Sequence, residues 1–221
     1  MPGQTTQTAR PLPDAAGDRV LRYPAGALVI LTGLPGAGKS TMLRRLYAMD
    51  GTEAAPVVVD GVTVIDSAQS KARWAGTLVR APGRVRTAVV FATHLLRIRR
   101  ALAAGGPVIA HNRGCGPLVL RVFARMARRS GAAFHLLLLD AGPEAALAGQ
   151  RARARVVRAR TFSYHRRRCE ALLARVRAGT AAPAAGAVVI DRSAAALLRG
   201  IVFDGEPASP SSRTEPSTIY R

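Results

Sequence analysis

Short apolar runs alternate along the chain with longer stretches in which apolar residues recur at helical spacing. The run at 27–32 (ALVILT) is unbroken, as in a strand buried on both faces of a sheet. Helical periodicity is clearest at 85–102. The alternation predicts an α/β domain with a mostly parallel, five-stranded sheet and helices on both faces. The five predicted strands are 27–32, 62–66, 107–110, 134–139 and 187–190.

The ends of the chain differ from its middle. Residues 1–20 and 205–221 are poor in apolar side chains, so burial offers little to offset the entropy of ordering them. We therefore expect one domain over 21–204 between two disordered tails. Within it, residues 57–60 (VVVD) are either an earlier part of a hairpin with the second strand or a loop.

The segment GLPGAGKS at 33–40 matches the phosphate-loop pattern G-x-x-x-x-G-K-[ST], and it lies between a predicted buried strand and a predicted helix. Its glycines let successive backbone N–H groups point at a polyphosphate, beside the positive end of the helix dipole. We expect Lys39 to reach the β and γ phosphates and Ser40 to bind Mg²⁺. Thr41 either contacts the α-phosphate region or packs. The predicted nucleotide-binding residues are Gly33, Leu34, Pro35, Gly36, Ala37, Gly38, Lys39, Ser40 and Thr41.

The rest of the chain narrows the class of phosphate-loop protein. An Asn-Lys-x-Asp segment, which guanine-specific switch proteins carry, does not occur, and neither does the Asp-Glu dipeptide of motor-type ATPases. These absences favour a small kinase.

Five segments, in order, carry a family resemblance: GLPGAGKST, VIDSAQSKAR, PVIAHNRG, HLLLLDAGPEAALAGQRARAR and VVIDRSAA. Over about residues 27–203 the chain resembles the P-loop kinases that include zeta-toxin-like, polynucleotide 5′-kinase-like and chloramphenicol-phosphotransferase-like proteins, often described as AAA-family ATP-binding proteins. The resemblance implies transfer of the γ-phosphate of ATP to a hydroxyl of a small-molecule or nucleotide-like acceptor. The acceptor itself is not identified by the sequence.

The resemblance also implies roles for individual residues. An Asp that closes the second strand binds the acceptor hydroxyl and acts as general base, and Asp66 matches it. A carboxylate there can accept the hydroxyl proton. Asp66 or Ser67 would also serve as the cap of the next helix, and Asp60 is a rival base. Where the family usually has an Asp that supports Mg²⁺, this chain has Asn112, beside His111, which either contacts substrate or packs.

An arginine-dense stretch follows the fourth strand. Small kinases close an arginine-bearing lid over the nucleotide, where guanidinium groups stabilise the transferring phosphoryl group. By resemblance, Arg153 and Arg155 are the predicted catalytic lid residues. After the fifth strand, Asp191 either borders the nucleotide base or caps a helix that begins near Ser193.

Composition adds a second reading of function. The chain has 33 Lys and Arg against 13 Asp and Glu, a net charge of +20, and only two of the basic residues are lysines. Such charge suits a polyanionic partner, although codon usage in a GC-rich genome would have the same effect. The alternative to a kinase is therefore an ATP-binding regulatory or nucleic-acid-associated NTPase with slow hydrolysis.

Two further expectations concern the surroundings of the protein. Cys115 and Cys169 are too few for a disulfide framework, so we expect ordinary thiols and a cytoplasmic location. No apolar run is long enough to cross a bilayer, so no membrane partner is expected.

Overall fold

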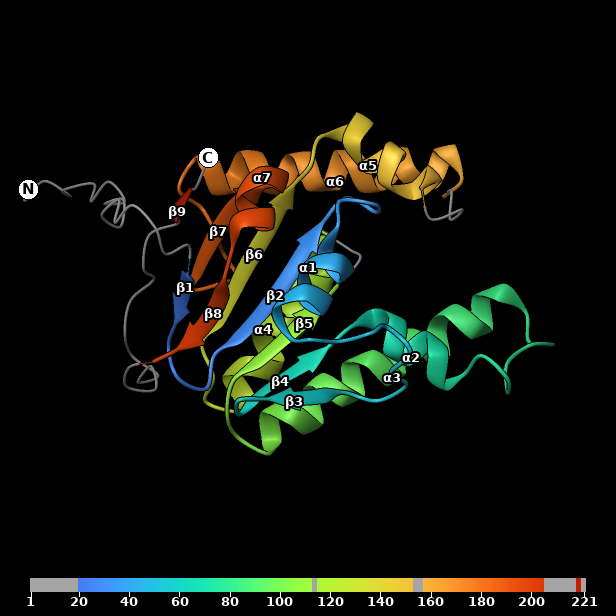
Figure 1. Ribbon diagram of the computed structural model, residues 1–221, viewed down its shortest axis with the longest axis horizontal. Coiled ribbons are helices and arrows are strands. Elements are labelled where there is room, and N and C mark those ends of the chain that lie inside the picture. The colour runs from blue at the N-terminus through green and yellow to red at the C-terminus, as the bar shows by residue number, and fades with distance from the viewer. Residues whose placement is uncertain (1–19, 113–114, 153–156, 205–217, 220–221) are drawn as a thin grey trace, which may run out of the picture.

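The computed structural model of the protein describes residues 20–112, 115–152, 157–204 and 218–219. A central sheet with helices on both faces makes up most of it (Figure 1). This confirms the predicted α/β class, the mostly parallel sheet and the two helical layers. The predicted lid residues Arg153 and Arg155 lie outside the described residues, as do 1–19 and most of 205–221.

The central sheet has the strand order β3-β4-β5-β2-β6-β7-β9, and among the strands in the described residues only β3 runs antiparallel to its neighbour. Strand β2 lies in the middle, and all of its residues are buried, as its unbroken apolar run predicts. The seven strands are β2 (Leu28–Gly33), β3 (Val57–Val59), β4 (Val62–Ile65), β5 (Val108–His111), β6 (Phe134–Asp140), β7 (Gly186–Asp191) and β9 (Thr218–Ile219).

The prediction of five strands was wrong. The uncertain segment at 57–60 contributes β3, which forms a hairpin with β4, and Thr218–Ile219, within the predicted C-terminal tail, pair with β7. Neither β3 nor β9 has a strong strand pattern in its sequence, because each is a short edge strand that forms by pairing with a longer neighbour. A separate two-stranded parallel sheet joins β1 (Val20–Tyr23) to β8 (Gly200–Phe203).

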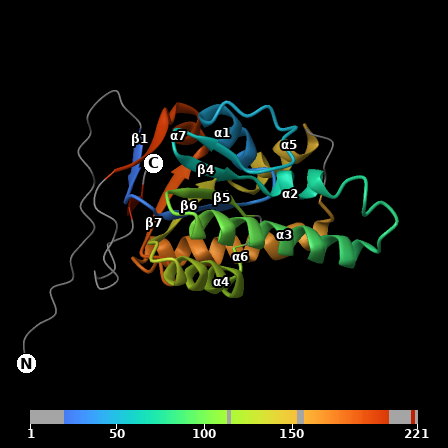
Figure 2. The same ribbon diagram turned by 90° about the horizontal axis from the view of Figure 1, so that it is seen from below.

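The helices form one layer on each face of the sheet (Figure 2). Helices α1 and α7 lie against one face, and α3, α4 and α6 lie against the other. None of the helices in the described ranges combines the length and apolar character that a bilayer-spanning segment requires. The helices are α1 (Lys39–Leu46), α2 (Ser67–Arg73), α3 (Gly83–Ala103), α4 (Pro117–Arg129), α5 (Pro143–Arg151), α6 (Ala159–Arg177) and α7 (Arg192–Leu197).

The order of the strands indicates where a ligand site is expected. The chain passes from β2 to β4 and β5 on one side, and then crosses to β6 on the other side of β2. The carboxyl ends of β5, β2 and β6 therefore meet where the direction of winding reverses. In open α/β sheets this switch point is where ligands bind, and the segment GLPGAGKS follows β2 directly at that edge.

Candidate active site

The register of the sheet places the carboxyl ends of β4, β5 and β2 next to one another. In β4 and β5, Ile65 is paired with Ala110, so that Asp66 and His111 come next to each other. In β5 and β2, His111 is paired with Leu31, and the N–H of Asn112 donates to the carbonyl of Leu31. Asp66, His111 and the start of the phosphate loop therefore share one edge of the sheet.

The phosphate loop curls tightly between β2 and α1. The N–H of Ala37 donates to the carbonyl of Leu34, and α1 begins at Lys39, directly after Gly38. Gly38 has φ +107° and Gly36 has φ +92°, a left-handed region that favours glycine. A Cβ on Gly36 would lie 2.1 Å from the carbonyl oxygen of Ala146 in α5, so only glycine fits there.

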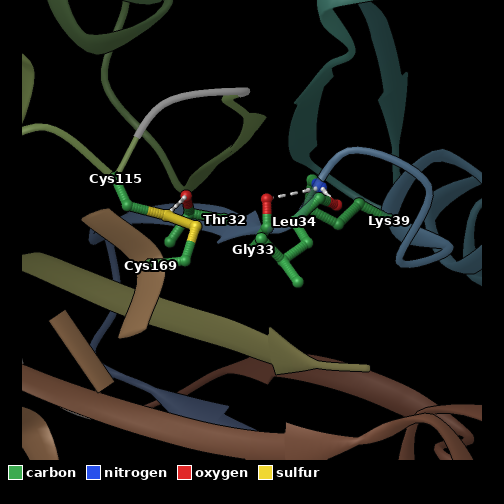
Figure 3. The surroundings of a disulfide bond; sticks show 6 residues. All are labelled: Thr32, Gly33, Leu34, Lys39, Cys115 and Cys169. Carbon is green, nitrogen blue, oxygen red and sulfur yellow. Dashed lines mark hydrogen bonds between the residues drawn. A yellow bond between two sulfur atoms is a disulfide. The ribbon is translucent and has the colours of Figure 1, made fainter. Parts of the chain in front are cut away.

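Lys39 lies inside this curl. Its Nζ donates to the carbonyl oxygens of Gly33 at 2.9 Å and Leu34 at 2.7 Å, and the residue is only 4% exposed (Figure 3). The ammonium group is thus held within the loop that the motif assigns to phosphates. A single positive charge close to several backbone N–H groups makes the loop an anion site.

Beside the loop, His111 joins three oxygen-bearing side chains. Its Nδ1 lies 3.0 Å from Oδ1 of Asp66, 3.3 Å from Oγ of Ser67 and 3.5 Å from Oγ of Ser40. With an ionised Asp66 as acceptor, Nδ1 is the donor. The sequence left open whether His111 contacts substrate or packs. The structure makes it a buried bridge between Asp66 and the phosphate-loop serine.

The carboxyl group of Asp66 is held in its charged form. Burial by itself raises the pKa of Asp66, but the hydrogen bond and positive charge of His111 outweigh it, with help from the N–H of Ala68 and the hydroxyl of Ser40. The net result is a pKa well below the ordinary value for Asp. Behind this pair, burial lowers the pKa of His94 to about 4, and the charge of His111 adds to that effect.

Asp66 also caps α2, so both roles considered for it are structurally compatible. Its Oδ1 accepts from the N–H of Ala68 at 2.8 Å, while the side chain of Gln69 accepts from the N–H of Asp66 at 3.0 Å, which completes a capping box. The rival base Asp60 lies in the turn between β3 and β4, at the opposite end of β4 from Asp66. It is therefore not at the edge that carries the phosphate loop.

Helix α5 packs directly on the phosphate loop. The buried Gln150 donates from Nε2 to the carbonyl oxygen of Pro35 at 2.9 Å, and its Oε1 accepts from the N–H of Val157 at 2.8 Å. A Cβ on Gly149 would lie 2.4 Å from the carbonyl oxygen of Gly36. Gln150 thus ties the loop to α5 and to the backbone of Val157. Sequence reasoning missed it, because a glutamine in an arginine-rich stretch has no distinguishing local signal.

Two other expected residues have clear positions. Asn112, in place of the usual Asp at the end of the third predicted strand, is buried at the end of β5. Asp191 is the N-cap of α7, and its Oδ1 accepts from the N–H of Ala194 at 2.6 Å. Capping, one of its two considered roles, is therefore what the geometry shows.

The expectation of two ordinary thiols was wrong. Cys115 and Cys169 form a disulfide that joins the loop after β5 to α6, and Sγ of Cys115 lies 3.3 Å from Oγ1 of Thr32 (Figure 3). Thr32 immediately precedes the phosphate loop. The two cysteines are 54 residues apart in the sequence, and only the crossing of α6 over the sheet edge brings them together.

Comparison with known proteins decides the family. A family model described as an AAA domain matches residues 28–178, from the start of β2 to the end of α6. The chain belongs to the AAA domain family. This confirms the resemblance to AAA-family ATP-binding proteins that the phosphate loop and the later segments indicated. No curated protein matches the sequence.

Several solved structures resemble this AAA domain in fold but share little sequence with it. The tunicamycin resistance protein of Deinococcus radiodurans is 15% identical, with a TM-score of 0.46 over 67% of this chain and 80% of that one. A gluconokinase from Sinorhizobium meliloti 1021 is 14% identical, with a TM-score of 0.46 over 80% and 90%. The PezAT toxin–antitoxin structure of Streptococcus pneumoniae is 14% identical, with a TM-score of 0.44 over 63% and 56%. At these scores, no functional conclusion rests on them.

Proposed function

We propose that this AAA domain protein is an ATP- and Mg²⁺-dependent phosphotransferase that moves the γ-phosphoryl group of ATP to a hydroxyl of a small-molecule or nucleotide-like acceptor. The observation that carries the proposal is the joining of Asp66 to the phosphate-loop Ser40 through His111. This contact supports the proposal because it holds a buried, ionised carboxylate beside the phosphate loop, where an acceptor hydroxyl would have to approach.

The residues divide the chemistry between them. The backbone N–H groups of residues 33–41 other than Pro35, together with the ammonium of Lys39, bind the triphosphate and offset the charge that develops on the γ-phosphoryl group. Asp66 accepts a hydrogen bond from the acceptor hydroxyl and aligns its oxygen with the γ-phosphorus. The new O–P bond forms as the bond to the β,γ-bridging oxygen breaks, ADP leaves, and the hydroxyl proton passes to Asp66 and then to solvent.

The lowered pKa of Asp66 is compatible with this role. A carboxylate with a low pKa is a weak base, but the transition state of phosphoryl transfer is loose in most analyses, so that the hydroxyl proton can depart late. Orientation then matters more than basicity. His111 supports this by fixing the position of Oδ1. The lid arginines Arg153 and Arg155 are proposed to stabilise the transferring phosphoryl group on the strength of the resemblance alone.

The side chains present fit a magnesium ion. Mg²⁺ takes hard oxygen ligands and is usually held by one or two protein groups together with substrate phosphates. The hydroxyl of Ser40 and the carboxylate of Asp66 are such groups. In the part of the chain that the structure describes, no group of three or more His, Cys, Asp and Glu side chains gathers to form a larger metal cage. When bound, the ion neutralises phosphate charge.

Asn112 supports a second candidate, a nucleotide-binding protein with slow hydrolysis. An amide oxygen can orient a metal-bound water but brings no charge, and Asn112 occupies the strand-end position next to the phosphate loop. The two candidates differ in one observable, the stimulation of ATP turnover by an acceptor.

The test is ATP consumption with Mg²⁺, alone and with a mixed panel of nucleosides, 5′-hydroxyl oligonucleotides, amino sugars and aminocyclic antibiotics. Wild type is measured beside Lys39→Ala, with folding checked by circular dichroism. We expect one acceptor class to stimulate turnover and Lys39→Ala to abolish it with the fold retained. ATP binding without any stimulated turnover would favour the second candidate. Full turnover by Lys39→Ala would overturn the role of the phosphate loop in both candidates.

A further inference from the structure

The first half of α6 borders a hollow of about 570 Å³ that the site described above does not use. This volume is within the range of small-molecule pockets. The side chains around it are Ala159, Arg160, Ser163, Tyr164, Arg167 and Arg168, and we call this the α6 hollow.

The charge of the α6 hollow is entirely positive. In the described part of the chain, three arginines line it and no acidic residue does. Among the residues that the structure describes, no ion pair involves any of the three, whereas the neighbouring Arg166 pairs with Glu170. The guanidinium of Arg168 lies 4.3 Å from the centre of the half-exposed Tyr164 ring. A concave surface with several guanidinium groups and no internal counter-charge favours an anion.

One end of the α6 hollow is linked through the disulfide to the strand that leads into the phosphate loop. Arg168 directly precedes Cys169, whose disulfide partner Cys115 contacts Thr32 at the start of that loop (Figure 3). An Nη atom of Arg168 would lie 2.5 Å from a Cβ on Gly116, which follows β5. In Figure 1, α5 and α6 lie on one side of the carboxyl edge of the sheet, and α2 and α3 lie on the other. Arg168 of the hollow thus lies beside the segment that follows β5, at the carboxyl edge of the sheet.

We infer that the α6 hollow binds an anionic group, a phosphate or a carboxylate, carried by the acceptor in addition to the hydroxyl that receives the phosphoryl group. The inference rests on the proposed function and names the acceptor class: an acidic small molecule rather than a neutral one. The planar guanidinium groups of Arg160 and Arg167 suit both oxyanions, because each can donate two parallel hydrogen bonds. Binding there holds the acceptor while its hydroxyl faces Asp66.

The test separates the α6 hollow from the phosphate loop. The protein is first saturated with Mg²⁺ and β,γ-imido-ATP, so that the loop is occupied, and is then titrated with inorganic phosphate, with gluconate and with uncharged glucose by calorimetry. We expect saturable binding of phosphate, gluconate or both, and none of glucose. The anion that binds more tightly identifies the charged group of the acceptor. Failure of both anions to bind would overturn the inference.

Paired variants control for net charge. Arg160→Gln with Arg167→Gln removes two exposed charges from the α6 hollow, and Arg121→Gln with Arg125→Gln removes two exposed charges from α4. We expect the α6 pair to weaken anion binding about tenfold or more, since hydrogen bonds to charged groups are the stronger kind. The α4 pair should bind as wild type does. Equal weakening in both pairs would show a general charge effect and would overturn the inference.

Two results separate this inference from the proposed function. If imido-ATP binding is weakened in the α6 pair and anion binding is not, the hollow serves the nucleotide and the inference fails while the kinase proposal stands. If ATP turnover is independent of Lys39, the kinase proposal fails and with it the assignment of the anion to an acceptor, whereas saturable anion binding that is lost in the α6 pair would still show an anion site in the hollow.

Discussion

Nδ1 of His111 lies 3.0 Å from Oδ1 of Asp66, in a buried hydrogen bond that joins the end of β5 to the end of β4. The same nitrogen faces the hydroxyl of Ser40 in the phosphate loop. His111 therefore connects the proposed acceptor-binding carboxylate to the nucleotide site. The proposed catalytic role of Asp66 rests on this contact in addition to the helix cap, so the charge and the position of the carboxyl group can be tested separately.

Asp66→Asn tests the charge without removing the helix cap, because Asn caps helices about as well as Asp. We expect nucleotide affinity to be retained and phosphoryl transfer to fall by about 10²- to 10⁴-fold, the usual contribution of a proton-accepting group. Nucleotide binding by calorimetry and turnover with acceptor are the measurements. Asp191→Asn, at the cap of α7, is the control for folding stability. Equal loss of binding and transfer would reduce Asp66 to a structural cap.

His111 is proposed as a positioning residue, and the pH profile of activity tests it. His111 lowers the pKa of Asp66, so its removal in His111→Leu should raise that pKa. The ionised fraction of Asp66 then falls at a higher pH, and the acid limb of kcat/KM moves towards neutral pH. His111→Asn can keep a hydrogen bond to Oδ1 and should shift the limb less. Identical acid limbs in wild type and both variants would contradict the positioning role.

Gly149→Ala tests the contact between α5 and the phosphate loop. The added Cβ would lie 2.4 Å from the backbone oxygen of Gly36, so α5 or the loop has to move. We expect a loss of about 1–3 kcal/mol in the free energy of unfolding, the usual cost of overpacking, together with weaker ATP binding. Gly83→Ala, at a helical glycine with open space around it, should be neutral or slightly stabilising. Matching behaviour of the two variants would argue against the contact.

The disulfide should contribute to stability through the unfolded chain. A link across 54 residues restricts that chain by about 4 kcal/mol in the loop-entropy estimate. Urea unfolding with and without dithiothreitol should show a lower midpoint for the reduced wild type. The double variant Cys115→Ser with Cys169→Ser should unfold at the lower midpoint under both conditions. A wild-type midpoint that is indifferent to the reductant would show that the two thiols are not bonded in solution.

Local signals were sufficient for the central elements of the fold and for the phosphate loop. The run at 27–32 became β2 because an unbroken apolar segment has to be buried on both faces. The motif at 33–40 became a strand–loop–helix unit because its glycines permit the backbone angles that the loop needs. In each case the residues that determine the structure lie within a few positions of one another. For the edge strand β3 the sequence left a hairpin and a loop open, and the edge strand β9 was not predicted, because pairing with β4 and β7 completes these two strands.

The contacts that define the site join residues far apart in the sequence. Asp66 and His111 are separated by 45 residues, Cys115 and Cys169 by 54, and Pro35 and Gln150 by 115. The sequence by itself determined the candidate residues, since phosphate-binding and proton-accepting chemistry requires particular side chains. Tertiary structure alone decided which of them meet, since that depends on strand order, on the register of β4 against β5, and on where α5 and α6 cross the sheet edge.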